Sequence, residues 1–533
     1  MPHQHPFRNE PLLDFSEEQN RASVQAGLRE VENRITKGSF YARPIINGEE
    51  LRSGDTFART DPSDQSTTVG VVEFADIKMA ERAVATCAEG FPAWRATPVE
   101  QRAIALNRMA SIMRERKSLL TAIMIREVGK TWREADADVA EAIDFCDYYA
   151  AEMRRISPPR LTEQVMGEEN HYLYQPRGVT VVIAPWNFPL AIACGMAVAA
   201  LVAGNPVILK PAEQSSLIGN QLARIILEAG VPKDAFAFLP GKGEEVGPYL
   251  TGHPQVSMIV FTGSRPVGLS IVESAAKVPP GQRMIKKVVA ELGGKNAIIV
   301  DEDADFDDAV RGVLSSAFGF AGQKCSACSR LIVVGSAYEP FIQRLAAATQ
   351  DLIVGNASDP SSFLGPVVDE EAHKRITSTI SSASTQLTLL AQAKVPAEIF
   401  QRGNFVPPTI FRDVPSSHPI WTDEIFGPVV ACAQARDFDH ALRLATSSEY
   451  ALTGGVFSRH PQNLAKAKEE FRVGNLYINR GITGALVGRQ PFGGFLMSGI
   501  GSKAGGPDYL LQFMEPRVVT ENTMRRGFSP DIA

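Results

Sequence analysis

Two segments of the 533-residue chain contain residues whose types suit covalent catalysis: VVAELGGKN, with Glu291, and FAGQKCSACSR, with Cys325. A cysteine thiolate is a strong nucleophile toward a carbonyl carbon, and a carboxylate can act as the general base that activates water. This pair suits attack on an aldehyde, loss of hydride to a nicotinamide and hydrolysis of the resulting thioester. We therefore predict Cys325 as nucleophile and Glu291 as base.

The developing oxyanion needs hydrogen-bond donors, and Asn187 in the segment PWNFP and the main-chain N–H of Cys325 are candidates. Other interpretations of the cysteine exist. Taken alone, Cys325 is well explained as a small buried hydrophobe, and with Cys328 it forms a CxxC pair that can indicate a redox or zinc site. The sequence contains no second CxxC and no nearby histidines at ligand spacing, so we expect no metal.

Polar residues follow two apolar segments that we predict to be parallel strands, VTVVIAP and VILKP, and the second is followed by Lys210 and Glu213. Ligands bind at the carboxyl ends of strands in open parallel sheets, which predicts a nucleotide site here. Taken alone, Glu213 is better explained as a first-turn carboxylate that faces a helix dipole. Two glycine-rich turns, with Gly243 in the first and Gly263 and Ser264 in the second, would let the backbone approach a pyrophosphate. Neither turn has the GxGxxG spacing.

The elements that must position these residues follow an alternating pattern. Residues 18–149 have a mostly helical pattern, and the segment ISPPRLTEQVMGEENHYLYQ then interrupts it, which suggests a protruding hairpin. From Val179 onward short apolar runs alternate with helical ones, and a second such series begins near Ala297. This pattern predicts two doubly wound α/β units. The glycine-rich tail ends in EPRVVTENTM, which is typical of an edge strand.

Composition excludes several classes of partner. The chain has 54 basic and 60 acidic residues, a formal net charge of -6, and no long block of one sign, so neither nucleic acid nor an anionic membrane is expected as a partner. No apolar run is long enough to cross a bilayer, and the N-terminus lacks the features of a signal or transit peptide. Six thinly spread cysteines fit a reducing compartment. We expect a cytoplasmic protein.

The motifs PWNFP, KPAEQSS, FTGSRPVG, ELGGKN, GQKCSA and EIFGPV occur in this order over nearly the whole chain, which therefore resembles the aldehyde dehydrogenase superfamily. The resemblance implies an α/β fold with a Rossmann-type NAD-binding domain (residues 1–155 and 175–296) and an α/β catalytic domain (297–483). A small β oligomerisation flap with a substrate-anchor loop (156–174 and 484–533) completes it. The implied assembly is a homodimer or an assembly of dimers.

The same resemblance implies NAD as cofactor and Asn187 as oxyanion donor. The implied cofactor-binding residues are Trp186, Lys210, Glu213, Gly243, Gly263, Ser264, Glu424 and Phe426. A carboxylate at Glu213 accepts hydrogen bonds from ribose hydroxyls and repels a 2′-phosphate, so NAD should be preferred over NADP.

The segments GITGALVGRQPFGGF and SGIGSKAGGPDYLLQFM are similar to the branch of this superfamily that oxidises L-glutamate γ-semialdehyde. An α-carboxylate needs convergent donors, and the Gly484–Ala485 loop offers backbone N–H groups while Ser326 offers a hydroxyl. Phe188 and Phe492 would enclose the aliphatic chain, although phenylalanine is by default a core residue.

The resemblance also makes Glu141 a gate to the aldehyde pocket, whereas the sequence alone predicts an exposed helix residue. Because the chain begins directly with aldehyde dehydrogenase-like sequence, we expect a monofunctional enzyme linked to a separate proline dehydrogenase. Two other hypotheses stay open: an aldehyde dehydrogenase for another substrate such as succinate semialdehyde, and a non-catalytic scaffold on the same fold.

Overall fold

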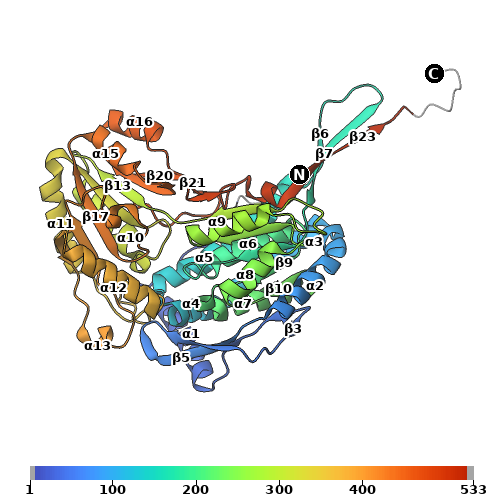
Figure 1. Cartoon of the computed structure of the whole chain (residues 1–533), viewed down its shortest axis with the longest axis horizontal. Helices are drawn as coiled ribbons and strands as arrows, with labels where there is room; N and C mark the ends of the chain where they lie inside the picture. Colours follow the sequence, from blue (N-terminus) through green and yellow to red (C-terminus); the bar gives the residue numbers. More distant parts are fainter. Residues whose placement is uncertain (1–6, 525–533) are drawn as a thin grey trace.

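The computed structural model describes residues 7–524. Two large sheets, each with helices on both faces, form most of the molecule, and a long β arm extends away from them (Figure 1). Among the helices of the described residues, none combines the length and apolarity that a membrane crossing requires.

The first sheet has the strand order β22-β12-β11-β8-β9-β10-β2-β3 within residues 7–524. The parallel strands at its centre are β12 (Lys287–Glu291), β11 (Met258–Thr262), β8 (Thr180–Ile183), β9 (Val207–Lys210) and β10 (Phe236–Phe238). Antiparallel strands flank them: β22 (Gly499–Ile500), β2 (Ile45–Ile46) and β3 (Glu49–Glu50).

Helices cover both faces of this sheet. One face is covered by α1 (Glu18–Thr36), α3 (Val99–Glu115), α4 (Lys117–Val128), α5 (Trp132–Ile156), α6 (Ala191–Val202) and α7 (Ser216–Glu228). The other is covered by α2 (Ile77–Ala96), α8 (Gly243–Gly252) and α9 (Arg265–Ala276). Val182 and Val260 enter the first core, whereas their neighbours Val181 and Ile259 enter the second. Because successive strand residues face opposite sides, strands buried on both faces have continuous apolar sequences, as predicted.

The second sheet is also doubly wound and has the order β15-β16-β17-β14-β13-β19-β20 in the described part of the chain. Its strands are β15 (Thr388–Gln392), β16 (Thr409–Arg412), β17 (Val429–Ala435), β14 (Cys328–Val334), β13 (Asn296–Val300), β19 (Thr453–Phe457) and β20 (Asn475–Ile478). Helices α10 (Phe306–Phe318) and α11 (Tyr338–Gln350) pack on one face, and α12 (Glu370–Ser384), α15 (Phe438–Ala445) and α16 (Pro461–Glu470) on the other. The prediction of two doubly wound units is confirmed.

The arm is a three-stranded antiparallel sheet of β6 (Arg160–Leu161), β7 (Glu168–Pro176) and β23 (Met514–Asn522). Strand β23 pairs with β7 along its whole length (Figure 1). The predicted hairpin, which contains β6 and β7, and the predicted edge strand β23 therefore belong to the same sheet. Both strand predictions are confirmed.

The prediction of a helical segment over residues 18–149 is wrong for residues 41–73. This stretch contains β1 (Tyr41–Ala42), the strands β2 and β3, and the antiparallel pair β4 (Thr56–Asp61) and β5 (Asp64–Glu73). The sequence of β5, DQSTTVGVVE, is rich in β-branched residues, which favour strands. The long helices on either side obscured this short signal.

Residues 484–513 join the two units. Strand β22 pairs with β12 of the first sheet, and β21 (Phe495–Leu496) pairs with β18 (Tyr450–Ala451), which directly precedes β19 of the second. This crossing segment lies beside the carboxyl end of β12 and contributes several residues to the cavity described below.

Candidate active site

Cys325 lies in a tight loop between α10 and β14. The loop begins with the 3-10 turn η2 (Gly319–Gly322), in which Phe320 and Ala321 have left-handed φ values of 49° and 53°. Gly322 follows with φ 69°, and a Cβ there would lie 2.4 Å from the carbonyl oxygen of Gly427. Left-handed backbone is costly for residues other than glycine and concentrates at functional sites. This loop presents the half-buried Cys325 thiol to the cleft.

The electrostatic surroundings of Cys325 disfavour its thiolate in the free protein. Burial raises the pKa of the Cys325 thiol well above its ordinary value, and the nearby carboxylates of Glu291 and Glu424 raise it further. The backbone N–H groups of Ser326 and of Cys325 itself act in the opposite direction. The nucleophile therefore depends on main-chain donors for its activation.

Glu291 is the last residue of β12, and burial raises the pKa of its carboxyl group to about 8, with the positive charge of Lys503 opposing the rise. Its Oε1 atom is buried and has no hydrogen-bond partner within residues 7–524. A Cβ on Gly493 would lie 3.7 Å from Oε2 of Glu291 and 3.5 Å from Cγ of Lys503, so both side chains flank this glycine. A carboxyl group with a raised pKa and a free oxygen suits a general base.

Asn187 is buried beside the nucleophile loop and donates a hydrogen bond from Nδ2 to the carbonyl oxygen of Gln323, at 3.0 Å. Gln323 is itself fixed because its Oε1 accepts from the N–H of Val368 at 2.8 Å. An amide nitrogen carries two hydrogens, and no second acceptor for Asn187 is found among the described residues. One N–H remains to stabilise a ligand oxygen.

A large cavity of about 950 Å³ contains every residue predicted to bind the cofactor. Those residues are Trp186, Lys210, Glu213, Gly243, Gly263, Ser264, Glu424 and Phe426. At one end, Oε1 of Glu213 lies 3.2 Å from Nζ of Lys210 and accepts the N–H of Gly243 at 2.6 Å. At the other, Oε1 of Glu424 accepts the N–H of Gly294 at 2.8 Å.

This cavity fits a dinucleotide. A carboxylate near each end can accept hydrogen bonds from ribose hydroxyls, and the wall of the cavity also includes the N-terminus of α9, which follows Gly263 and Ser264. Ser264 makes no side-chain capping bond in the described structure, so its hydroxyl is available to a ligand. The Trp186 and Phe426 rings meet edge to face with centroids 5.5 Å apart. NAD is the cofactor that this arrangement favours.

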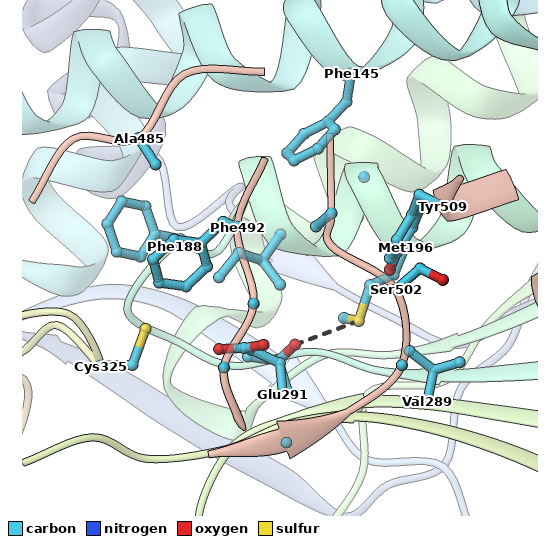
Figure 2. Close-up of a pocket in the computed structure, with 18 of the residues that line it drawn as sticks. Phe145, Phe188, Met196, Val289, Glu291, Cys325, Ala485, Phe492, Ser502 and Tyr509 are labelled. Atoms are coloured by element: carbon cyan, nitrogen blue, oxygen red, sulfur yellow. Dashed lines mark hydrogen bonds between the residues drawn. The ribbon is translucent and has the colours of Figure 1, made fainter. Parts of the chain in front are cut away.

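A second, smaller cavity of about 110 Å³ lies on the other side of Cys325. It contains all the residues predicted to bind substrate: Glu141, Phe188, Ser326, Gly484, Ala485 and Phe492. In the view of Figure 2, Phe188 and Phe492 lie between Ala485 and the two residues Cys325 and Glu291, and all five line this cavity. Cys325 lines both cavities and so lies where they meet.

The sequence alone predicted that Glu141 is an exposed helix residue, and this prediction is wrong. It lies half-buried on α5 and lines the smaller cavity. Burial and the neighbouring charge of Asp138 raise the pKa of its carboxyl group to about 8. Hydrophobic periodicity did not reveal this because the surface covering α5 comes from residues distant in sequence.

Cys328 does not share the environment of Cys325. It is the first residue of β14, is buried in the core and donates from Sγ to the carbonyl oxygen of Arg330 at 3.4 Å. All six cysteines are free thiols, and within residues 7–524 no group of three or more His, Cys, Asp or Glu side chains could hold a metal ion.

Three polar residues near the site were missed by the sequence analysis: Lys130, Asn296 and Lys503. Lys130 is fully buried and lies 4.0 Å from the centroid of the Phe188 ring. Lys503 donates from Nζ to the carbonyl oxygens of Gly474 and Gly493, at 2.7 and 2.5 Å. Most of their contacts are with aromatic rings and backbone carbonyls, which no local sequence motif marks.

Comparisons with known proteins agree with the geometry. The model of the aldehyde dehydrogenase family matches residues 50–519, and the chain belongs to this family. Among its relatives is the 1-pyrroline-5-carboxylate dehydrogenase of Geobacillus kaustophilus, which is 47% identical over 97% of this chain and 99% of the relative.

Solved structures give the same result. A 1-pyrroline-5-carboxylate dehydrogenase from Thermus with bound NAD is 44% identical with a TM-score of 0.94, covering 98% of this chain and all of that one. Proline utilization A from Bdellovibrio bacteriovorus is 50% identical with a TM-score of 0.96 over 99% of this chain. The chain spans 55% of the length of that protein.

Proposed function

We propose that this protein oxidises L-glutamate γ-semialdehyde, which forms from 1-pyrroline-5-carboxylate, to L-glutamate with NAD, the second step of proline catabolism. The observation that carries the proposal is that Cys325 lines both the dinucleotide cavity and the small pocket with the Gly484–Ala485 loop. The names of the relatives support the substrate, and the NAD bound to the Thermus protein supports the cofactor.

In the first half of the reaction, the Cys325 thiolate attacks the aldehyde carbon and forms a hemithioacetal. The Asn187 side chain and the Cys325 N–H donate to the oxyanion as it develops. Glu213 and Glu424 would hold NAD through its riboses, and the nicotinamide would accept the hydride that leaves the hemithioacetal carbon. The substrate carbon is then a thioester on Cys325, in a pocket with mostly apolar walls.

In the second half, Glu291 takes a proton from a water molecule, whose oxygen attacks the thioester carbon. The Cys325 sulfur leaves as thiolate, and the carboxylic acid is released. Oε1 of Glu291, which has no partner among the described residues, is the atom available for this water. A hydrolytic base also disfavours a coenzyme A-acylating enzyme, which would not need one.

Substrate selection is assigned to the far end of the small pocket. Gly484 has φ +73°, a conformation that glycine adopts without strain, and its loop and the Ser326 hydroxyl are placed to bind the α-carboxylate. Phe188 and Phe492 enclose the methylene groups between that carboxylate and the aldehyde. At the cofactor end, the Glu213 carboxylate disfavours a 2′-phosphate and so favours NAD over NADP.

The test is NADH formation with a panel of aldehydes. We expect the highest kcat/KM for L-glutamate γ-semialdehyde, while Cys325→Ala loses turnover and still binds NAD. A higher kcat/KM for succinate semialdehyde or a simple alkyl aldehyde would overturn the substrate assignment. Full activity of Cys325→Ala would instead overturn covalent catalysis.

We further propose a cytoplasmic homo-oligomer built from dimers that works in sequence with a proline dehydrogenase. The free cysteines support a reducing compartment, and the exposed β23 supports contacts between subunits. The similarity to part of a proline utilization A protein supports the link to proline oxidation.

A further inference from the structure

Asn296, the first residue of β13, bonds directly to the nucleophile loop. Its side chain is 2% exposed, and Nδ2 donates to the carbonyl oxygens of Cys325 and Ala327, at 2.7 and 2.9 Å. Its Oδ1 accepts the N–H of Thr453 at 3.0 Å, which fixes the orientation of the amide. Both N–H groups and the oxygen of the Asn296 amide are therefore used, and together they hold the nucleophile loop against β19.

The bond to Cys325 has a geometric consequence for the next N–H group. A trans peptide unit is planar, so the C=O of Cys325 and the N–H of Ser326 point in opposite directions. Because Asn296 holds that oxygen on the side away from the thiol, the N–H of Ser326 faces the sulfur. This N–H is one of the two groups that favour the Cys325 thiolate, whereas burial and two carboxylates oppose it.

We propose that Asn296 is a positioning residue that aims the N–H of Ser326 at the sulfur of Cys325 and so maintains the nucleophile in a reactive state. The proposal rests on Cys325 being the nucleophile. It does not depend on the identity of the aldehyde, because thiol reactivity is measured without substrate.

Thr453 provides an internal contrast. Its Oγ1 donates to the carbonyl oxygen of Ser326 at 3.2 Å. That peptide unit controls the N–H of Ala327, which donates to the carbonyl oxygen of Lys324 at 3.0 Å and not to the thiol. Thr453→Val removes a hydrogen bond from the same loop with little change in shape, yet leaves the Cys325 carbonyl held.

The experiment measures alkylation of Cys325 by iodoacetamide between pH 6 and 10 in the full-length protein, read by mass spectrometry of the Cys325 peptide. In Asn296→Ala we expect the profile of rate against pH to move upward by about one pH unit, so that the rate at pH 8 falls about tenfold, since a hydrogen bond to a charged group is lost. Thr453→Val should move the profile far less. The initial burst of NADH should slow in Asn296→Ala with little change in the affinity for NAD.

A control separates this role from general destabilisation. Asn205 is a buried asparagine remote from the nucleophile, and its Nδ2 donates to the carbonyl oxygen of Phe513 at 2.9 Å. Asn205→Ala should lower thermal stability without moving the profile of alkylation rate against pH. An unchanged profile in Asn296→Ala, or equal shifts of the profile in all three variants, would overturn the proposal. If Asn296→Ala does not fold, Asn296→Ser serves, since the shorter hydroxyl cannot reach both carbonyls.

Discussion

Burial raises the pKa of both groups that we assign to the chemistry, Cys325 and Glu291. In the free protein both are therefore largely protonated near neutral pH, and two negative charges do not repel each other across the site. Each group gains its charge from local help: backbone N–H groups favour the thiolate, and Lys503 favours the carboxylate.

The first prediction concerns the pH dependence of thioester hydrolysis. Glu291 acts as a base only when ionised, and its pKa is about 8, so the rate after the NADH burst should rise about tenfold per pH unit below 7 and level off above 8. Rapid-mixing kinetics at saturating substrate measures this rate.

Lys503→Met extends the same measurement. Removing the positive charge should raise the pKa of Glu291 further, so the levelling-off moves to higher pH, while Lys503→Arg should keep it near 8. A hydrolysis rate that does not change between pH 6 and 9, or a shift toward lower pH in Lys503→Met, would contradict the role of Glu291.

The sequence predicted those site residues that lie within recognisable motifs. Cys325, Glu291 and Asn187 were predicted, and the two cavities bring them together with their expected neighbours. Asn296 and Lys503 were missed because they act on backbone carbonyls. Any residue provides such a carbonyl, so the sequence contains no pattern that reports the contact.

Asp138 of α5 makes buried polar contacts with Lys130, which lies just before α5, and with the start of α6. Nζ of Lys130 lies 2.7 Å from Oδ2 of Asp138 on α5, and both side chains are fully buried. Oδ1 of Asp138 accepts the N–H of Ala191, the first residue of α6, at 2.6 Å. Since Lys130 also contacts the Phe188 ring, the pair holds the segment that carries Asn187 and Phe188.

The second prediction follows from that burial. Lys130→Met leaves Asp138 as an unpaired buried charge and should lower the free energy of unfolding by about 3–5 kcal/mol. In Lys130→Met/Asp138→Asn at least half of this loss should be recovered, because asparagine still accepts from Ala191. Equilibrium unfolding in urea measures both.

An exposed pair supplies the control for this comparison. Lys374 and Glu370 are 2.6 Å apart with side chains 71% and 64% exposed, so Lys374→Met should cost less than about 1 kcal/mol. A Lys130→Met protein as stable as Lys374→Met would show that the buried pair does not contribute to stability.

The elements themselves were largely predictable. Strands buried on both faces, such as β8 and β11, have continuous apolar sequences that mark them. The strands of residues 41–73 were missed because β1, β2 and β3 have only two residues each and lie between long helices. Such short strands form because a neighbouring strand is present, which local sequence does not show.

In the whole molecule, the β arm extends away from both units, and contacts within a single chain do not explain why it is so exposed. β23 is exposed along nearly its whole length, with Val518 60% exposed, and it is an edge strand of the arm sheet. Exposed edge strands and apolar side chains are sites of association unless something protects them. This supports the proposed assembly of subunits.

The third prediction tests that assembly. Val518→Asp places a charge on the arm and should convert the oligomer to a smaller species at micromolar concentration, measured by light scattering with size exclusion. Ile353→Asp introduces the same charge at a residue of similar exposure, 55%, in the second unit, and should leave the mass unchanged. Equal masses for the two variants would exclude the arm from the subunit contact.

The arrangement of the two units was predictable only in part. Glu291 and Cys325, predicted as base and nucleophile, come from different units and line the same cavity. The crossing of residues 484–513 from the second unit back to β12 was not expected, because β21 and β22 have only two residues each and pair with distant partners. Topology of this kind depends on long-range pairing and leaves no periodic signal.

The most direct test of the account is to trap the acyl group on the enzyme. Glu291→Gln is mixed with NAD and L-glutamate γ-semialdehyde, quenched in acid after the burst of NADH, and examined by mass spectrometry. We predict one glutamate γ-acyl group per chain, located on the Cys325 peptide. A burst without an adduct, or an adduct on another cysteine, would contradict covalent catalysis by Cys325 and hydrolysis by Glu291.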